Sequence, residues 1–67
     1  DSNMGIQKGS LVRVIRAPHF GSMGMVLELP PELQKMESET MVRVAKINVD
    51  GNELTIPRSN LEMVETD

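Results

Sequence analysis

At 67 residues the chain has room for one small domain, and a domain of this size buries only about 60% of the surface that its unfolded chain exposes. It contains no cysteine, which excludes disulfide bonds and thiolate metal sites as sources of stability. Ten acidic and seven basic side chains give a formal charge of −3, whereas a dedicated nucleic-acid-binding domain is typically strongly basic. No apolar run reaches the roughly 18 residues that span a bilayer, and we find no secretory signal pattern, so a cytoplasmic location away from membranes is expected.

The two ends of the chain lack any apolar pattern. Residues 1–8 are polar, and we expect a flexible lead-in or an expression-tag remnant ahead of Met4. A second interpretation is that the whole sequence is a piece of a longer protein, and we favour this interpretation slightly. Residues 65–67 are expected to form a fraying tail, which leaves residues 9–64 as the predicted domain.

The first strand is predicted over residues 11–16, where apolar and basic side chains alternate. This alternation places Val12 and Val14 on one face of the strand. Pro18 ends it, since proline lacks the amide that a ladder of hydrogen bonds needs.

A corner and a second strand follow. Gly21 and Gly24 bracket the corner, where we expect backbone angles that other residues avoid. The second strand is predicted over residues 25–29, with Met25 facing away from Val26. We expect Met25, like Met63 near the end of the chain, to fill an irregular small core.

Residues 30–39 do not have the pattern of a barrel strand. Proline followed by good helix formers predicts one or two helical turns, with Leu33 and Met36 on one face. Two interpretations stay open. In the favoured one the segment is a lid over an open barrel end, and in the other it protrudes and meets a partner.

Asp50-Gly51 is the strongest local signal in the chain. A two-residue hairpin of the twist-matched type needs positive φ at both central positions, and Asp-Gly adopts them at low cost. The hairpin joins two predicted strands, and a single turn, expected to be 3₁₀, leads into a last one. In chain order these elements are predicted at residues 41–49, 52–56, 57–60 and 61–64.

Together these elements predict an all-β fold. Five short strands, an Asp-Gly hairpin between the third and fourth, and a one-turn link into the fifth describe a small SH3-like barrel. A short helical or irregular insertion separates strands two and three.

The corner also resembles the KOW motif, found in the carboxy-terminal domain of NusG-type elongation factors and in several ribosomal proteins. That motif has a glycine, alternating valines and then Pro-Phe-x-Gly-x-x-Gly-x-Val. Ala17 stands here in place of a usual glycine, and His19 in place of the aromatic, with Phe20 one position later. The resemblance implies an SH3-like barrel that contacts RNA, a ribosomal component or a transcription complex. The residues in step with the motif are Gly9, Val12, Val14, Pro18, Gly21, Gly24 and Val26.

Catalysis is not expected from this sequence. His19 has no partner with which to build a catalytic or metal site, and the serines occupy turn positions without a matching base. We therefore expect no enzyme, no cofactor and no metal, and we assign structural turn roles to Gly21, Gly24, Asp50 and Gly51.

Two binding functions remain. The favoured hypothesis is a protein-interaction module that docks through an open sheet edge or through apolar side chains. The alternative is a module associated with RNA or ribonucleoprotein through basic side chains, although a chain with one phenylalanine and no tyrosine or tryptophan offers little stacking surface for bases. The candidate contact residues are Arg13, Arg16, His19, Phe20, Met23, Leu33, Met36 and Arg58.

Overall fold

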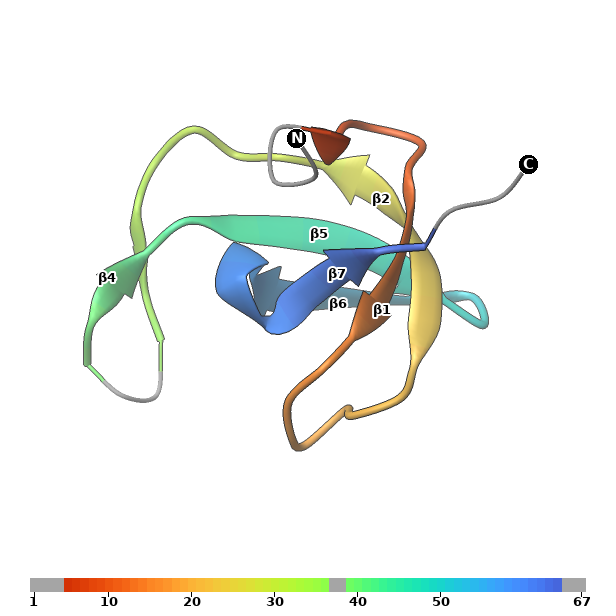
Figure 1. The fold of residues 1–67 in the computed structure, drawn as a ribbon. Coiled ribbons are helices and arrows are strands. Elements are labelled where there is room, and N and C mark those ends of the chain that lie inside the picture. The colour runs from red at the N-terminus through yellow and green to blue at the C-terminus, as the bar shows by residue number, and fades with distance from the viewer. Residues whose placement is uncertain (1–4, 37–38, 65–67) are drawn as a thin grey trace.

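The structure is a computed structural model that describes residues 5–36 and 39–64. Its centre is a five-stranded antiparallel sheet in the order β6-β5-β2-β1-β7. A separate two-stranded hairpin, β3 with β4, projects from it (Figure 1). The sheet strands are β1 (Leu11–Val14), β2 (Met23–Glu28), β5 (Val44–Val49), β6 (Asn52–Pro57) and β7 (Leu61–Met63). The hairpin strands are β3 (Gln34–Lys35) and β4 (Met41–Val42), and the 3₁₀ turn η2 spans Arg58–Asn60.

The core is aliphatic and lies on one face of the sheet. The sheet bends so that β1 and β7 pass over β5 and β6 (Figure 1). Among the described residues, β6 and β7 remain the two ends of the strand order, so the sheet is not closed. Burial of branched side chains removes apolar area from water, worth about 25 cal/mol per Å². The buried cluster consists of Val12, Val14, Val26, Ala45, Ile47, Ile56 and Leu61.

The prediction that Met25 fills the core is wrong, because its side chain is 51% exposed. Val26, on the opposite face of β2, is buried and pairs with Ile47. The expected alternation is present, but the pairing register decides which face of β2 meets the core. Gly24 pairs with the buried Val12, and Val26 lies on the same face as Gly24, so Val26 is the buried residue. Met63 lies opposite Val12 and is half-buried.

A bulge then changes the alternation along β2. The register shifts between Val26 and Glu28, so two successive exposed residues separate Val26 from Leu29. Leu29 consequently packs against the core cluster. An extra residue in one strand re-aims every side chain that follows it.

The two corner glycines serve different purposes. Gly21 has φ +91°, as predicted, which is a conformation that L side chains rarely adopt. Gly24 lacks this conformation; a Cβ there would overlap the carbonyl oxygen of Asn48 and lie 2.8 Å from Cγ2 of Val49. The expectation of a forbidden backbone angle at Gly24 is therefore wrong, and the close approach of β2 and β5 requires the glycine.

The first strand ends two residues before the predicted boundary. The amide of Ile15 donates to the carbonyl oxygen of Asn60 at 2.8 Å, which ties the chain to η2. Within the corner, the Gly21 amide donates to the Val14 carbonyl at 2.8 Å, and the Val14 amide donates to the Ser22 carbonyl at 2.8 Å. The corner is thus closed by backbone hydrogen bonds, and its Ala17–Pro18 peptide bond is cis.

The predicted helical turns between strands two and three are absent from the described residues of that segment. Residues 34–35 pair instead with residues 41–42, so the insertion is a short β-hairpin. Pairing with this antiparallel partner outweighs the helix propensity of the segment. Within the turn, the Glu39 amide donates to the Met36 carbonyl at 2.8 Å. Residues 1–4 of the predicted lead-in and the whole predicted tail lie outside the described residues. Ile6, in the described half of the lead-in, packs against the core cluster.

The predicted strand over residues 41–49 is interrupted at Arg43. The Arg43 guanidinium donates to the carbonyl of Pro31, and the Arg43 carbonyl accepts the Arg58 amide at 3.0 Å. These bonds join the hairpin and η2 to the start of β5.

The Asp50-Gly51 hairpin is confirmed. Asp50 has φ 54° and Gly51 has φ 87°, and Val49 pairs with Asn52 across the turn. The strand, 3₁₀ turn and strand predicted after it are present, with boundaries that differ by about one residue.

Candidate functional site

A cavity of about 280 Å³ opens where four segments meet. These are the corner after β1, the end of β6, the turn η2 and the end of the hairpin strand β3. Arg16 and His19 come from the corner, Met36 follows β3, and Asn60 ends η2. Residues far apart in the sequence meet here because the Ile15 amide is bonded to the Asn60 carbonyl.

The floor of the cavity is apolar and its rim is polar. Val14 and Ile56, both part of the buried cluster, form its base. Arg16, His19 and Thr55 contribute polar groups to the lining. Among the described residues, no acidic side chain lines the cavity. A ligand could therefore insert an apolar group while its negative charge stays at the rim.

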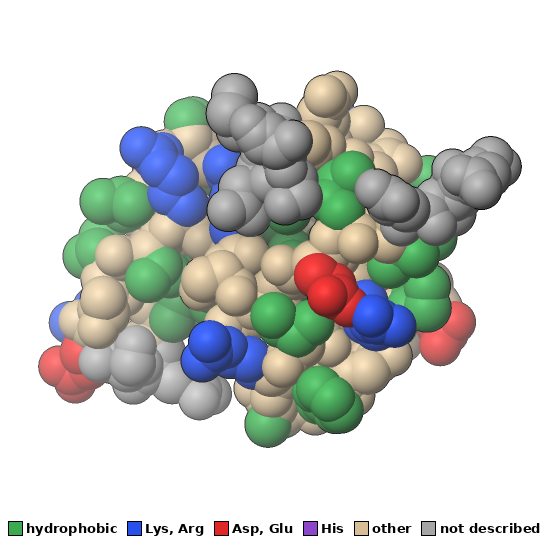
Figure 2. Space-filling model, viewed as in Figure 1, with side chains coloured by type: hydrophobic (Ala, Val, Ile, Leu, Met, Phe, Trp, Pro, Cys, Tyr) green, Lys and Arg blue, Asp and Glu red, His purple; other side chains and the backbone are tan. Residues whose placement is uncertain are grey.

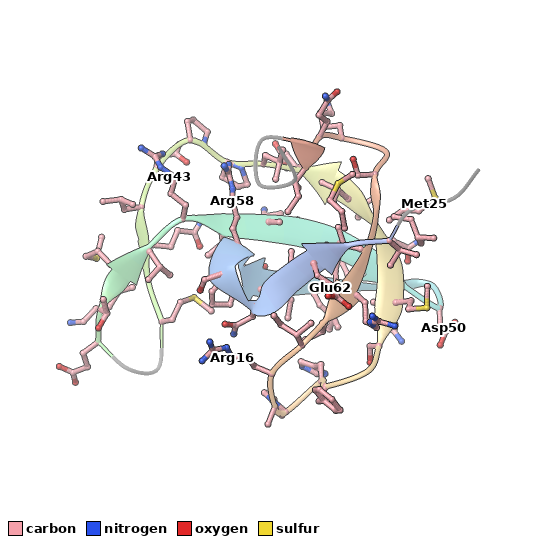
Figure 3. The ribbon with its side chains drawn as sticks, viewed as in Figure 1. Arg16, Met25, Arg43, Asp50, Arg58 and Glu62 are labelled. Carbon is pink, nitrogen blue, oxygen red and sulfur yellow. The ribbon has the colours of Figure 1, made fainter. Side chains whose placement is uncertain are left out.

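The arginines do not form one basic face. Arg13 forms an ion pair with Glu62, its register partner on β7, with Nε donating to Oε2 at 2.6 Å. Arg58 Nε donates to the Val44 carbonyl at 3.3 Å. Figure 3 places Arg43 and Arg58 on one side of β5 and Arg16 on the other.

Arg16 is the exposed arginine for which the described part of the chain provides no hydrogen bond or ion pair. On the face shown in Figure 2, basic side chains are separated by apolar and neutral surface. A continuous phosphate-binding track is not visible on that face.

A second hollow, of about 370 Å³, lies on the other side of the corner. Arg13, Glu62 and Phe20 line it. The Phe20 ring is 73% exposed on a segment held by backbone hydrogen bonds. The corner therefore presents Arg16 and His19 to one hollow and Phe20 to the other.

The remaining candidate residues lie elsewhere. Met23 is exposed on β2 opposite Arg13, and Leu33 is exposed before β3, outside the set of residues that pack against the core. Sequence reasoning missed Thr55 and Asn60, which line the cavity. The predicted turn after β6 was a signal for Asn60, but its nearness to the corner depends on the topology.

The described residues contain no group of three histidine, cysteine or acidic side chains that could hold a metal ion. Within the same part of the chain, no helix is long and apolar enough to cross a membrane. In comparisons with known proteins, no family model and no curated sequence matches this chain.

Proposed function

We propose that this chain is a non-catalytic protein-binding domain with an SH3-like barrel of the KOW type, working in the cytoplasm as part of a larger protein. Support for the fold comes from the five antiparallel strands, the Asp-Gly hairpin and the single 3₁₀ turn that leads into β7. The same features led to the prediction of an SH3-like barrel from the sequence.

The observation that carries the function is the cavity beside the corner. An apolar floor with a few polar groups at its rim suits a side chain of a bound polypeptide, with apolar contact for affinity and hydrogen bonds for orientation. On the other side of the same corner, the exposed Phe20 ring offers a second contact, an aromatic side chain of a type enriched at the core of protein interfaces. Because the corner backbone is already hydrogen-bonded, little ordering is needed when a partner binds.

A role in RNA association is the second candidate, and one observation favours it. Arg16 and His19, two of the basic side chains predicted to contact RNA, line the same cavity. The basic groups are nevertheless dispersed, and two of them are ion-paired with Glu53 and Glu62. A domain that engages about two to four phosphates would bind RNA weakly at physiological salt, with a shallow dependence on salt concentration.

The test is selection of binding peptides from a displayed random library, followed by amide chemical-shift mapping of the ¹⁵N-labelled domain. We expect shifts for residues 14–20 and 55–60, and loss of binding in Phe20→Ala. Leu27→Ala is the matched control, since Leu27 is also an exposed apolar side chain but lies on β2 away from the corner.

Two results would overturn the proposal. One is a failure to enrich any peptide, together with tight binding of labelled single-stranded RNA that is lost steeply between about 50 and 200 mM salt. The other is shift changes confined to the outer face of β2.

A further inference from the structure

We infer that the segment received by the cavity is an extended acidic peptide, in which a carboxylate pairs with Arg16 beside an apolar side chain on the cavity floor. This inference rests on the proposed function and gives the bound protein a chemical class. It draws on the charge of the lining, on the lack of a partner for Arg16 among the described residues, and on the edge of β6.

The charge of the lining favours an anion. Arg16 and His19 are its titratable groups, and the other polar groups, those of Thr55 and Asn60, are neutral. Arg16 has no partner among the described residues, unlike Arg13, whose guanidinium already faces Glu62. A guanidinium binds a carboxylate through two parallel hydrogen bonds, which fixes orientation as well as charge.

The apolar part of the cavity adjoins this cation. Val14 and Ile56 provide a rigid base, while Met36 contributes a flexible thioether that adapts to side chains of different shape. A phosphodiester backbone would leave this floor uncovered, since it brings charge without an adjacent aliphatic group. A peptide carrying leucine or isoleucine next to aspartate or glutamate covers the apolar floor and also supplies a carboxylate to Arg16.

The cavity also opens onto the free edge of β6. Thr55, Ile56 and Pro57 are consecutive residues whose side chains alternate between faces, yet all three line it. Within the described residues, β6 is an end strand that pairs with β5 alone. The lining therefore runs along the strand edge rather than over one face.

Ladder geometry shows which backbone groups this edge offers. In a two-residue hairpin the residues that flank the turn, here Val49 and Asn52, form a hydrogen-bonded pair, and such pairs alternate along the ladder. Thr55, opposite Lys46, falls in a non-bonded pair, so its amide and carbonyl point to the free edge. The Arg58 amide donating to the Arg43 carbonyl fits this same alternation. An extended peptide can thus bond to Thr55 while its side chains reach the cavity, as in strand addition.

The test uses pools of immobilised eight-residue peptides with a fixed central pair and random residues elsewhere. The pairs are Leu-Asp, Leu-Glu, Leu-Asn and Leu-Lys. We expect the domain to be retained about three- to tenfold more on the two acidic pools than on the Leu-Asn pool, with the difference reduced by added salt. Arg16→Gln should remove the preference and Arg16→Glu should shift it to the Leu-Lys pool.

Two matched controls separate the site from general effects. Lys8→Glu makes the same change of charge at an exposed residue beyond the opposite end of β1, and should keep the acidic preference. Thr55→Pro removes the amide next to the cavity and should weaken retention on every pool. Glu53→Pro removes the other outward amide of β6, which lies away from the cavity lining, and should leave retention unchanged on every pool. Circular dichroism and urea melts confirm that each variant is folded.

The outcomes distinguish the proposed protein-binding function from the proposed acidic ligand. Retention on all pools without an acidic preference, unaffected by Arg16→Glu, leaves the protein-binding function standing and overturns the acidic ligand. Retention on no pool overturns both. Displacement of the acidic pools by single-stranded RNA, with shifts at Arg16 and His19, overturns the acidic peptide in favour of phosphate.

Discussion

The sheet and the hairpin insertion are held in different ways. In the sheet, branched side chains from all five strands meet in one buried cluster, and Val12, Ile47 and Val44 are fully shielded from water. The hairpin strands β3 and β4 have only two residues each, and no side chain of either is buried. Its attachment includes the Arg43 guanidinium bonded to the Pro31 carbonyl.

This difference indicates where stability and recognition reside. Burial in the sheet fixes the positions of the segments that leave it, including the corner and η2. The corner and hairpin can then expose Phe20, Leu33 and Met41 without contributing much to folding. Substitutions that compare the two regions follow, from the largest expected effect on the free energy of unfolding to the smallest.

Ile47→Ala tests the core directly. Ile47 is fully buried at the centre of β5, so truncation removes apolar contacts and leaves a cavity. We expect the free energy of unfolding to fall by about 2–5 kcal/mol in equilibrium urea melts. In a domain this small, that loss is enough to unfold much of the population at 37 °C. A loss below about 1 kcal/mol would show that the core is not where the sheet is held.

Gly24→Ala tests the close approach of β2 and β5. The added methyl overlaps the Asn48 carbonyl oxygen, which belongs to the backbone and cannot rotate away. Overpacking of this kind costs about 1–3 kcal/mol. Gly9→Ala is the control for a position with open space, although its positive φ adds some strain of its own. If Gly24→Ala melts with the parent, the two strands do not come this close.

Gly51→Val tests the hairpin between β5 and β6. Gly51 has φ 87° and nothing crowds the position of its Cβ, so the penalty is one of backbone conformation alone. A β-branched residue there should lower the free energy of unfolding by about 1–3 kcal/mol. Urea melts that superimpose on those of the parent would contradict the positive φ at this residue.

The strands of the sheet could be predicted from the sequence, whereas the hairpin insertion could not. Alternation along β1 and β5, and the Asp-Gly dipeptide, predicted the strands and the hairpin of the sheet, because burial on one face imposes a period of two. The choice between Met25 and Val26 as the buried residue needed the pairing of Val12 with Gly24, which one strand alone does not reveal. The insertion was predicted as helix because its composition favours one, and two-residue strands leave no periodicity to detect.

The candidate site shows a similar limit. Arg16, His19 and Met36 were singled out from the sequence as contact residues, and the structure brings them to one cavity. Their grouping depends on the hydrogen bond from Ile15 to Asn60, a contact over 45 positions that no local pattern contains. Arg58 was also predicted to be a contact residue, but its guanidinium donates to the Val44 carbonyl, and it lies on the opposite side of β5 from Arg16 (Figure 3).

Leu33→Ser is the substitution expected to change stability least, and it decides how the insertion acts. A lid would bury Leu33, and its loss would then cost about 1–3 kcal/mol. Leu33 is instead 49% exposed and lies outside the residues that pack on the core, so we expect a change within about 0.5 kcal/mol in urea melts.

The companion variant Met36→Ser removes the side chain that, among the described residues of the hairpin segment, lines the cavity. Met36 is half-buried, so some loss of stability is expected, and the informative quantity is the affinity for a selected peptide relative to that loss. Weakened peptide binding in Met36→Ser, with binding unchanged in Leu33→Ser, would place the contact of the insertion at the cavity wall rather than at the exposed side chain that precedes β3. A large loss of stability in Leu33→Ser would show that the hairpin is held by burial after all, and would remove the distinction between the two regions.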